Sequence, residues 1–385
     1  MIQEEILKRI HMNHKKRQFM QKQIFLLFIA FQLFSMNTFT QFHKNKISVI
    51  AYYAGNAKSV DEYPIEKLTH IIYSFCHLKG NELAVDNDDD AETIRHLVSL
   101  KKRNPSLKVI LSLGGWGGCK TCSEVFSTEE GRKEFAQSAK DLCEKYKTDG
   151  IDLDWEYPAI EGYPGHQYLP EDKHNFTLLI QALRTTLGDK YEISFAAGGF
   201  TKFLTQSIEW NAVMPFVDRV NLMTYDLING YSTVTGHHTP LYSTPEQIES
   251  TDHAVKYLDS IGVSKNKMVI GAAFYTRIFA VDSNSTSNNG LYQPCKFEKG
   301  VSHKQFDVKS YELQGYTYYW DDTAKAPYMY NPETKRFCTF DDERSLALKT
   351  KYAIDQKLDG IMFWQLADDN ADHDLLNAID KVAHQ

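Results

Sequence analysis

The chain has 385 residues, a formal net charge of −7 at pH 7 and a pI near 6.1. This acidic balance argues against nucleic acid or an anionic membrane surface as a partner, whereas a neutral polymer remains acceptable. The hydrophobic content of 42% is sufficient for a core, and the length allows one large α/β barrel or two smaller domains.

The N-terminal segment has the pattern of a secretory signal peptide. Basic residues between Lys8 and Lys22 precede an apolar run at residues 24–31. This run is shorter than the about 20 residues that a membrane span needs. We therefore expect a signal peptide over residues 1–40, cleaved between Ser35 and Gln41, and a secreted or periplasmic protein without a stable membrane anchor. An uncleaved anchor is the alternative.

From Ile47 onward, β-rich runs alternate with helical patterns, which predicts parallel strands joined by crossover helices. Eight runs fit strands: residues 47–53, 68–75, 107–113, 150–156, 191–197, 218–225, 267–274 and 358–365. Eight strand and helix units predict an α/β fold, a closed (β/α)8 TIM barrel over residues 46–384. A doubly wound open sheet is the alternative, although it would normally carry fewer strands.

Several helices between these strands have recognisable patterns. Residues 127–130, Ser-Thr-Glu-Glu, resemble a capping box, and apolar residues at helical spacing follow from Phe135 to Tyr146. Residues 172–187 and 245–261 are also expected to be helical, and a last helix should begin near Asp374.

The interval between the seventh and eighth predicted strands is too long for a single crossover. Residues 278–340 are rich in Tyr, Asn, Ser and Lys. We interpret them as a small α+β insertion that folds over the barrel mouth and forms one wall of a cleft. The alternative is a surface excursion without a role.

Export would permit disulfides. Cys119 and Cys122 form a Cys-x-x-Cys pair, for which a local disulfide or two free thiols fit better than a redox pair, because no thioredoxin-like context surrounds them. Cys143 falls on the apolar side of a predicted helix and should lie in the core. Cys295 and Cys338 could bridge the two ends of the insertion. The spacing of Cys and His residues indicates no zinc site.

Residues 149–158 combine strand alternation with a row of carboxylates. Asp152, Asp154 and Glu156 share one side of a strand, and the hydrophobic residues between them share the other. Carboxylates about 6.6 Å apart repel one another and favour no fold by themselves. Inside a closed barrel, burial and repulsion would raise at least one carboxyl pKa, which suits a general acid. The alternative is an ordinary strand with its polar face in water.

This segment resembles the signature of glycoside hydrolase family 18, the chitinase family. The family motif is Asp-x-x-Asp-x-Asp-x-Glu, and Asp149, Asp152, Asp154 and Glu156 fill its acidic positions. The resemblance covers about residues 46–384 and implies that Glu156 protonates the glycosidic oxygen. It also implies substrate assistance, in which the acetamido oxygen of the sugar attacks the anomeric carbon in place of a protein nucleophile.

The resemblance implies roles for the neighbouring residues as well. Asp154 would hold the acetamido group, Asp152 would share a proton with Asp154, and Tyr225 would donate its hydroxyl to the acetamido carbonyl. Asp149, at the start of the strand, is expected to be structural.

By the same resemblance, further residues at the carboxyl ends of the predicted strands shape the sugar subsites, with Trp364 as the floor under the reacting sugar. They are Tyr52, Phe75, Gly115, Trp116, Met223, Asp226, Tyr275, Arg277 and Trp364. The family often has Tyr-Gly-Arg after strand seven, whereas this chain departs from that pattern with Thr276 between Tyr275 and Arg277.

The resemblance implies a chitinase that hydrolyses chitin or chitooligosaccharides, without a metal or organic cofactor. The N-terminal pattern adds the expectation of secretion, and we expect a monomer. An endo-β-N-acetylglucosaminidase or a peptidoglycan-directed hydrolase of the same family is an alternative. A non-catalytic chitin-binding lectin is another, but lectins on this barrel typically have the acid replaced, and Glu156 is present here.

Overall fold

The computed structural model describes residues 47–282 and 288–384. The predicted signal peptide lies outside the described residues. Among the described helices, none is long and apolar enough to cross a membrane.

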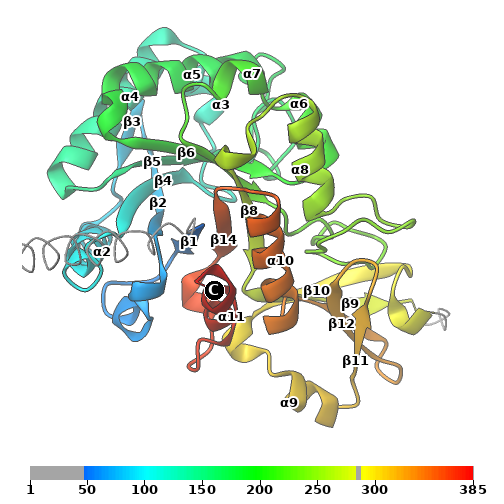
Figure 1. The fold of residues 1–385 in the computed structure, drawn as a ribbon. Coiled ribbons are helices and arrows are strands. Elements are labelled where there is room, and N and C mark those ends of the chain that lie inside the picture. Colours follow the sequence, from blue (N-terminus) through cyan, green and yellow to red (C-terminus); the bar gives the residue numbers. More distant parts are fainter. Residues whose placement is uncertain (1–46, 283–287, 385) are drawn as a thin grey trace, which may run out of the picture. The chain divides into compact units, whose positions relative to one another are not determined.

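Within the described residues, eight parallel strands close into a barrel, as the sequence predicted (Figure 1). They are β1 (Ser48–Tyr53), β2 (His70–Lys79), β4 (Lys108–Gly114), β5 (Gly150–Asp154), β6 (Glu192–Gly198), β7 (Arg219–Met223), β8 (Met268–Ala273) and β14 (Gly360–Trp364). Pairing of β1 with both β14 and β2 closes the ring, which excludes an open sheet. A short strand, β3 (Glu82–Ala84), forms an antiparallel hairpin with the end of β2.

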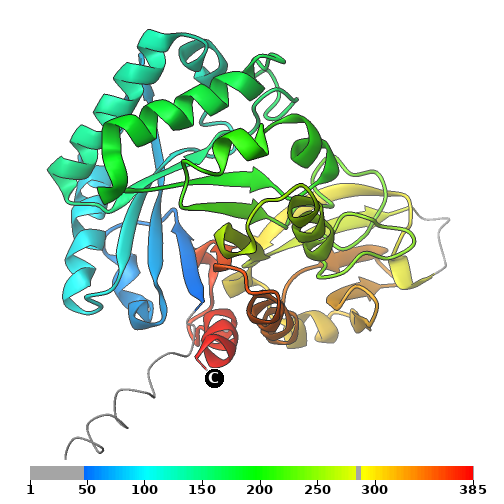
Figure 2. The ribbon, with the colours of Figure 1, turned by 45° about the horizontal axis from the view of Figure 1, so that its top comes forward.

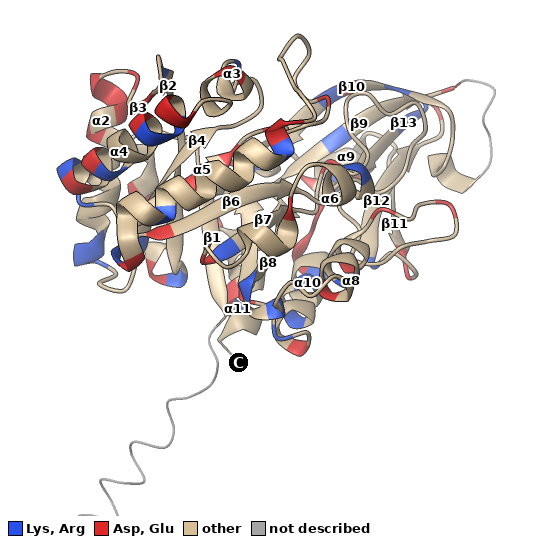
Figure 3. Ribbon diagram, turned by 90° about the horizontal axis from the view of Figure 1, so that it is seen from above, with Lys and Arg blue, Asp and Glu red and all other residues tan. Residues whose placement is uncertain are grey.

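Helices surround the strand ring on its outside (Figures 1 and 2). They are α2 (Asp88–Ser99), α3 (Cys122–Phe126), α4 (Glu129–Tyr146), α5 (Asp172–Leu187), α6 (Thr201–Gln206), α7 (Trp210–Val213), α8 (Thr251–Ser260), α10 (Glu343–Asp355) and α11 (Asp374–Ala383). Short 3-10 turns occur at Ser59–Glu62, Ile65–Lys67, Leu100–Lys102, Gly188–Lys190, Lys265–Lys267, Asn288–Gly290, His303–Gln305 and Leu366–Asp368. Acidic residues gather at the start of α2, whereas acidic and basic residues are interspersed along α4 (Figure 3).

Helix α5 and the start of α11 coincide with the prediction, but two helix starts differ from it. The cap of α4 is Thr128, whose hydroxyl accepts from the Gly131 N–H, so the third helical residue is a glycine and no reciprocal capping box can form. Helix α8 begins at Thr251, later than predicted, because Ser250 caps it by accepting from the His253 N–H.

Alternation along the strands separates two cores. Ile151, Leu153 and Trp155 of the motif are buried in the large core between the strand ring and the helices. The opposite faces of the strands fill the barrel interior with a smaller cluster that includes Ile50, Ile72, Ile110, Val269 and Met362. Because successive side chains of a strand point to opposite faces, the carboxylates of the motif enter the barrel interior.

The insertion between β8 and β14 is a five-stranded antiparallel sheet of order β10-β9-β13-β12-β11. It contains β9 (Tyr275–Val281), β10 (Cys295–Ser302), α9 (Val308–Leu313), β11 (Thr317–Asp321), β12 (Ala326–Asn331) and β13 (Arg336–Thr339). The sequence predicts an insertion over residues 278–340, whereas β9 already begins at Tyr275. The start of the sheet therefore carries Tyr275 and Arg277 themselves.

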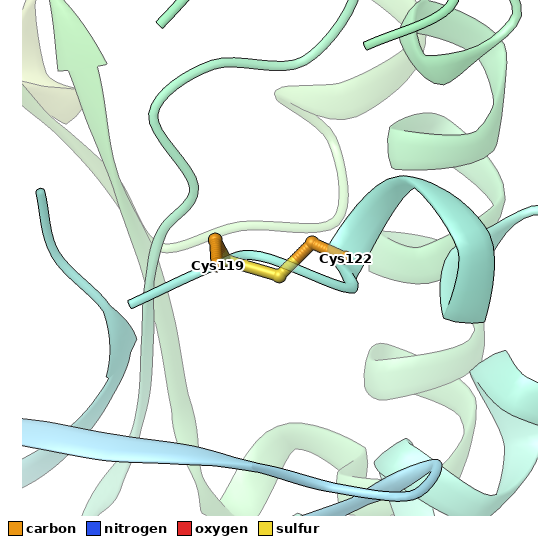
Figure 4. The surroundings of a disulfide bond; sticks show 2 residues. All are labelled: Cys119 and Cys122. Carbon is orange, nitrogen blue, oxygen red and sulfur yellow. A yellow bond between two sulfur atoms is a disulfide. The ribbon is translucent and has the colours of Figure 1, made fainter. Parts of the chain in front are cut away.

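The cysteine predictions have mixed outcomes. Cys119 and Cys122 form a disulfide (Figure 4), and Cys143 is buried in the core as expected. The suggested Cys295–Cys338 bridge is wrong, because both residues are free cysteines. Cys295 pairs with Val281 on one side of β9, and Cys338 pairs with Ile278 on the other. Their side chains join different hydrophobic clusters, so they lie on opposite faces of the sheet and two strands apart.

Candidate active site

The candidate site lies at the carboxyl end of β5. Asp152 and Asp154 belong to this strand, but β5 ends at Asp154, so Glu156 lies in the following turn rather than on the strand. Asp149, just before the strand, accepts the Val109 N–H at 2.7 Å and lies 2.6 Å from Lys101 Nζ. These contacts attach the start of β5 to its neighbours, consistent with a structural role for Asp149.

Asp152 is completely buried inside the barrel and each of its oxygens accepts two hydrogen bonds. The donors come from four strands: Ser194 at 2.6 Å and Asn221 at 3.1 Å to Oδ1, and Ser112 at 2.8 Å and Tyr52 at 3.2 Å to Oδ2. Burial raises the pKa of Asp152, and these donors oppose that rise. Sequence reasoning missed Ser112, Ser194 and Asn221. Ser112 and Ser194 are the register partners of Asp152, and strand register does not follow from the pattern within a single strand.

Asp154 differs from Asp152 in its partners. Its side chain is buried, and no hydrogen-bond partner reaches its Oδ1 among the residues that the structure describes. Burial, followed by the charges of Glu156 and Asp152, raises the pKa of Asp154 well above its ordinary value. A buried polar atom without a partner is costly unless a ligand or water satisfies it. Asp154 is therefore suited to accept a hydrogen bond from a bound molecule.

Glu156 has the protonation behaviour of a general acid. Burial is the main cause that raises its pKa to about 7, the charge of Asp226 adds to the rise, and a hydrogen bond with Tyr157 opposes it. Glu156 is nevertheless partly exposed. A carboxyl group with this pKa can give up and regain a proton near neutral pH.

Asp226 follows β7 and forms a two-point ion pair with Arg277 of β9, at 2.6 Å from Nε and 2.5 Å from Nη2. Burial alone would raise the pKa of Asp226, but contacts with His238 and Arg277 lower it to about 2. The buried His238, which sequence reasoning missed, has its Nδ1 3.6 Å from Asp226 Oδ1 and its ring 5.3 Å from that of Tyr275. Asp226 is therefore a permanent negative charge near Glu156.

Tyr225 and Met223 line the barrel interior beside the carboxylates. The Tyr225 hydroxyl lies 3.9 Å from Met362 Sδ, and its ring is 6.2 Å from that of Tyr275. Burial and then the charges of Asp154 and Glu156 raise the pKa of Tyr225 well above its ordinary value. The hydroxyl therefore keeps its proton and remains a hydrogen-bond donor.

Aromatic rings form a floor next to the carboxylates. Trp364 stacks on Phe75, with ring centroids 5.6 Å apart and planes at 13°, and its ring is 6.1 Å from that of Tyr52. Gly115 lies under Phe75, because a Cβ at this position would be 2.3 Å from Phe75 Cε2. Its N–H also donates to the Asp154 carbonyl at 2.9 Å, which links the loop after β4 to β5.

Trp116 lies at the rim and is 48% exposed. Its ring contacts those of Tyr163, Tyr157 and Tyr231, at centroid distances of 5.6, 6.3 and 6.4 Å. The three tyrosines follow β5 and β7 and were missed, because they lie in irregular loops whose paths no periodic pattern predicts. The structure therefore gathers the predicted site residues around one end of the barrel and adds this rim of tyrosines.

The comparisons with known proteins agree with this arrangement. The sequence profile described as Glycosyl hydrolases family 18 matches residues 48–369. Chitinase A1 of Niallia circulans is 37% identical over 317 residues, which cover 75% of this chain and 45% of that protein. The chain thus spans less than half of the length of that relative.

Two solved structures have similar folds. Chitinase ChiW from Paenibacillus sp. str. FPU-7 has a TM-score of 0.82 and 33% identity, covering 89% of this chain and 33% of that one. A glycoside hydrolase family 18 N-acetylglucosaminidase from Paenibacillus barengoltzii has a TM-score of 0.77 and 35% identity, covering 87% and 99%. The chain therefore belongs to glycoside hydrolase family 18 and is a glycoside hydrolase of the chitinase family.

Proposed function

We propose that this protein is a chitinase that hydrolyses β-1,4 bonds between N-acetylglucosamine units with retention of anomeric configuration. The observation that carries the proposal is a pair of neighbouring carboxyl groups, of which one has a pKa near neutrality and the other has an oxygen left unsatisfied within the described part of the chain. Glu156 has a pKa of about 7, and Asp154 presents an oxygen without a partner among the described residues. The first can protonate a leaving group, and the second can accept the N–H of an acetamido group.

In the first half of the reaction, Glu156 gives its proton to the glycosidic oxygen. The acetamido oxygen of the sugar attacks the anomeric carbon as the glycosidic bond breaks, and a cyclic oxazolinium forms. Asp154 holds the acetamido N–H and stabilises the positive charge, and the protonated Tyr225 hydroxyl donates to the acetamido oxygen. In the second half, Glu156 takes a proton from a water molecule, and the oxygen of that water attacks the anomeric carbon. The oxazolinium ring opens, and the product keeps the original anomeric configuration.

Asp152 supports Asp154 from within the barrel. Its oxygens already accept four hydrogen bonds. When Asp154 turns toward Asp152 to share a proton with it, that proton therefore has to displace one of these four donors from an Asp152 oxygen. The stacked rings of Trp364 and Phe75 provide a flat surface for the sugar next to these carboxylates.

An exo-acting N-acetylglucosaminidase is a second candidate. It is supported by the likeness to the Paenibacillus barengoltzii enzyme, whose chain is matched over 99% of its length. The two candidates share the chemistry and differ in where they cleave the polymer.

We also propose that the protein is exported, to the periplasm or out of the cell, and acts as a monomer. The N-terminal pattern supports export, and the Cys119–Cys122 disulfide is compatible with an oxidising compartment.

Product analysis on a chitin hexamer tests the proposal. A chitinase releases dimers and longer products, whereas an exo-acting enzyme releases monomers from one end. The mechanism has its own test, because the acetamido group of the substrate is the nucleophile. De-N-acetylated chitosan should be a poor substrate, and a thiazoline analogue of the intermediate should inhibit the enzyme. Fast cleavage of fully deacetylated polymer would overturn the mechanism. Cleavage of a high-mannose glycoprotein with chitin left intact would instead indicate an endo-β-N-acetylglucosaminidase.

The Glu156→Gln variant tests the assignment of the acid. It preserves the shape of the side chain but cannot give up a proton, so kcat should fall by at least about 10²-fold while hexamer binding persists. Glu161→Gln, an exposed neighbour in the same loop, is the matched control and should leave kcat unchanged. Full activity of Glu156→Gln would refute the assignment.

A further inference from the structure

The loop that carries Trp116 has an unusually permissive backbone. It runs from the end of β4 to the start of α3, and its glycines Gly114, Gly115 and Gly117 have φ values of 105°, 79° and 89°. Glycine loses more conformational freedom on ordering than other residues. The Trp116 side chain is half exposed and contacts the rings of three tyrosines, so its position depends both on these contacts and on the path of the loop that carries it.

The disulfide closes the far end of this loop. Cys119 is 3% exposed and Cys122 is fully buried, and their bond attaches the loop to the first residue of α3 (Figure 4). The Sγ of Cys119 also packs against the start of the loop, 3.1 Å from the position that a Cβ on Gly114 would occupy. The sulfur therefore contacts both ends of the segment that carries Trp116.

Helix α3 is itself attached to the rest of the barrel. Ser123, next to Cys122, donates to Asp172 Oδ1 at 2.9 Å, and both side chains are buried. Asp172 is the first residue of α5 and also accepts the Leu169 N–H at 2.8 Å. The disulfide thus connects a permissive loop to a fixed support.

The bond closes a very short ring, because the two cysteines are only three positions apart. The stabilisation that a disulfide gives to a whole fold grows with the length of the loop that it closes. A ring of this size restricts the unfolded chain little, so its main effect is expected to be local, on the loop that contains Trp116.

We propose that the Cys119–Cys122 disulfide is a positioning device for Trp116, which holds the indole where it can stack on a sugar unit of the polymer. The inference rests on the proposed function. Reduction by a dithiol breaks the S–S bond, transfers two electrons and two protons to the cysteines, and oxidises the reagent to its own disulfide. The loop then regains its freedom, and the sugar unit is bound more weakly by Trp116.

The experiment is a double-mutant cycle on the full chain. Steady-state kinetics on a chitin hexamer are compared for the wild type, Cys119→Ser/Cys122→Ser, Trp116→Ala and the triple variant. Loss of the disulfide should raise KM about fivefold, because loss of an aromatic stacking contact typically weakens binding by this factor or more. The same loss should change kcat less than twofold. In the Trp116→Ala background, loss of the disulfide should add no further increase in KM.

Controls separate this role from a general structural one. Cys338→Ala, which removes a buried free thiol in the insertion, should leave KM and kcat unchanged. An unchanged KM in the double serine variant would overturn the proposal. A further increase in KM on loss of the disulfide in the Trp116→Ala background would also overturn it. So would a joint decrease of kcat and thermal stability, because the bond would then act on the fold as a whole.

A measurement that does not depend on catalysis distinguishes failure of this inference from failure of the proposed function. If the oxidised wild type cleaves no hexamer, the proposed function fails. Acrylamide quenching of the Trp116 fluorescence, obtained as the difference between wild type and Trp116→Ala, still reports on the loop. Quenching should increase in the double serine variant and after dithiothreitol treatment, and equal quenching in all forms would overturn the positioning role.

Discussion

Arg277 of the insertion and Asp226 of the barrel form a two-point ion pair across the boundary between the two sheets, 51 positions apart in the chain. Strand β9 holds Arg277 between β10 and β13 and so fixes where its guanidinium lies. The charge of Asp226 in turn contributes to the raised pKa of Glu156. The insertion thus supplies Arg277, whose partner Asp226 influences the pKa of Glu156.

This relationship predicts opposite pH shifts for two variants. Asp226→Asn removes a negative charge near Glu156, so the alkaline limb of kcat/KM, set by loss of the Glu156 proton, should move to lower pH by roughly half a unit. Arg277→Met leaves Asp226 uncompensated and should move the same limb to higher pH. The measurement is the pH profile of kcat/KM on a soluble chitooligosaccharide. Shifts in the same direction would contradict the electrostatic coupling.

The raised pKa of Glu156 also affects stability. Its folded pKa of about 7 exceeds its ordinary value of 4.5, so the folded protein binds the proton more tightly than the unfolded chain does. Stability from this group is present below pH 4.5 and is lost as the pH rises through about 7. Glu156→Gln should therefore be more stable than the wild type at pH 8, by about 1 to 2 kcal/mol for a partly exposed group, and equally stable at pH 4. Urea unfolding at both pH values checks this, and a constant difference would contradict it.

A buried ion pair behind the site predicts a large loss of stability. Lys349 of α10 and Asp341 are both fully buried, with Nζ 2.7 Å from Oδ2. Asp341 also accepts the Ala273 N–H at the end of β8. Lys349→Met leaves the carboxylate buried without its partner and should cost about 3 to 5 kcal/mol in urea unfolding.

Lys351→Met on the same helix is the control for this loss. Lys351 forms an exposed pair with Asp355, and its removal should change stability by less than about 0.5 kcal/mol. If the two variants had equal effects, burial of the Lys349–Asp341 pair would not be the cause.

Cysteine labelling tests the sulfur chemistry. Without reductant, alkylation of the unfolded protein should modify Cys76, Cys143, Cys295 and Cys338 and leave Cys119 and Cys122 as a disulfide. In the folded protein Cys295 should react slowly, because burial raises the pKa of its thiol to about 11, and the other three free cysteines are buried and should not react. Mass spectrometry of the peptides distinguishes these outcomes. A Cys295–Cys338 linkage would contradict the sheet register.

The sequence alone was sufficient for the barrel, its eight strands and the acidic motif, because these depend on patterns within short segments. Strand alternation placed Asp152 and Asp154 opposite Leu153, and helical spacing identified α5 to the residue. The spacing of carboxylates also predicts that at least one of them has a raised pKa, and the pKa values of Asp152, Asp154 and Glu156 are all raised.

Only the tertiary structure decided which distant residues meet. Ser112, Ser194 and Asn221 surround Asp152 because of strand register, and Arg277 reaches Asp226 because an antiparallel sheet begins at Tyr275. The rejected Cys295–Cys338 bridge failed for the same reason, since β9 separates the two cysteines. Local patterns specify which face a side chain occupies, whereas register and loop paths, which arise from packing over the whole chain, specify its partner.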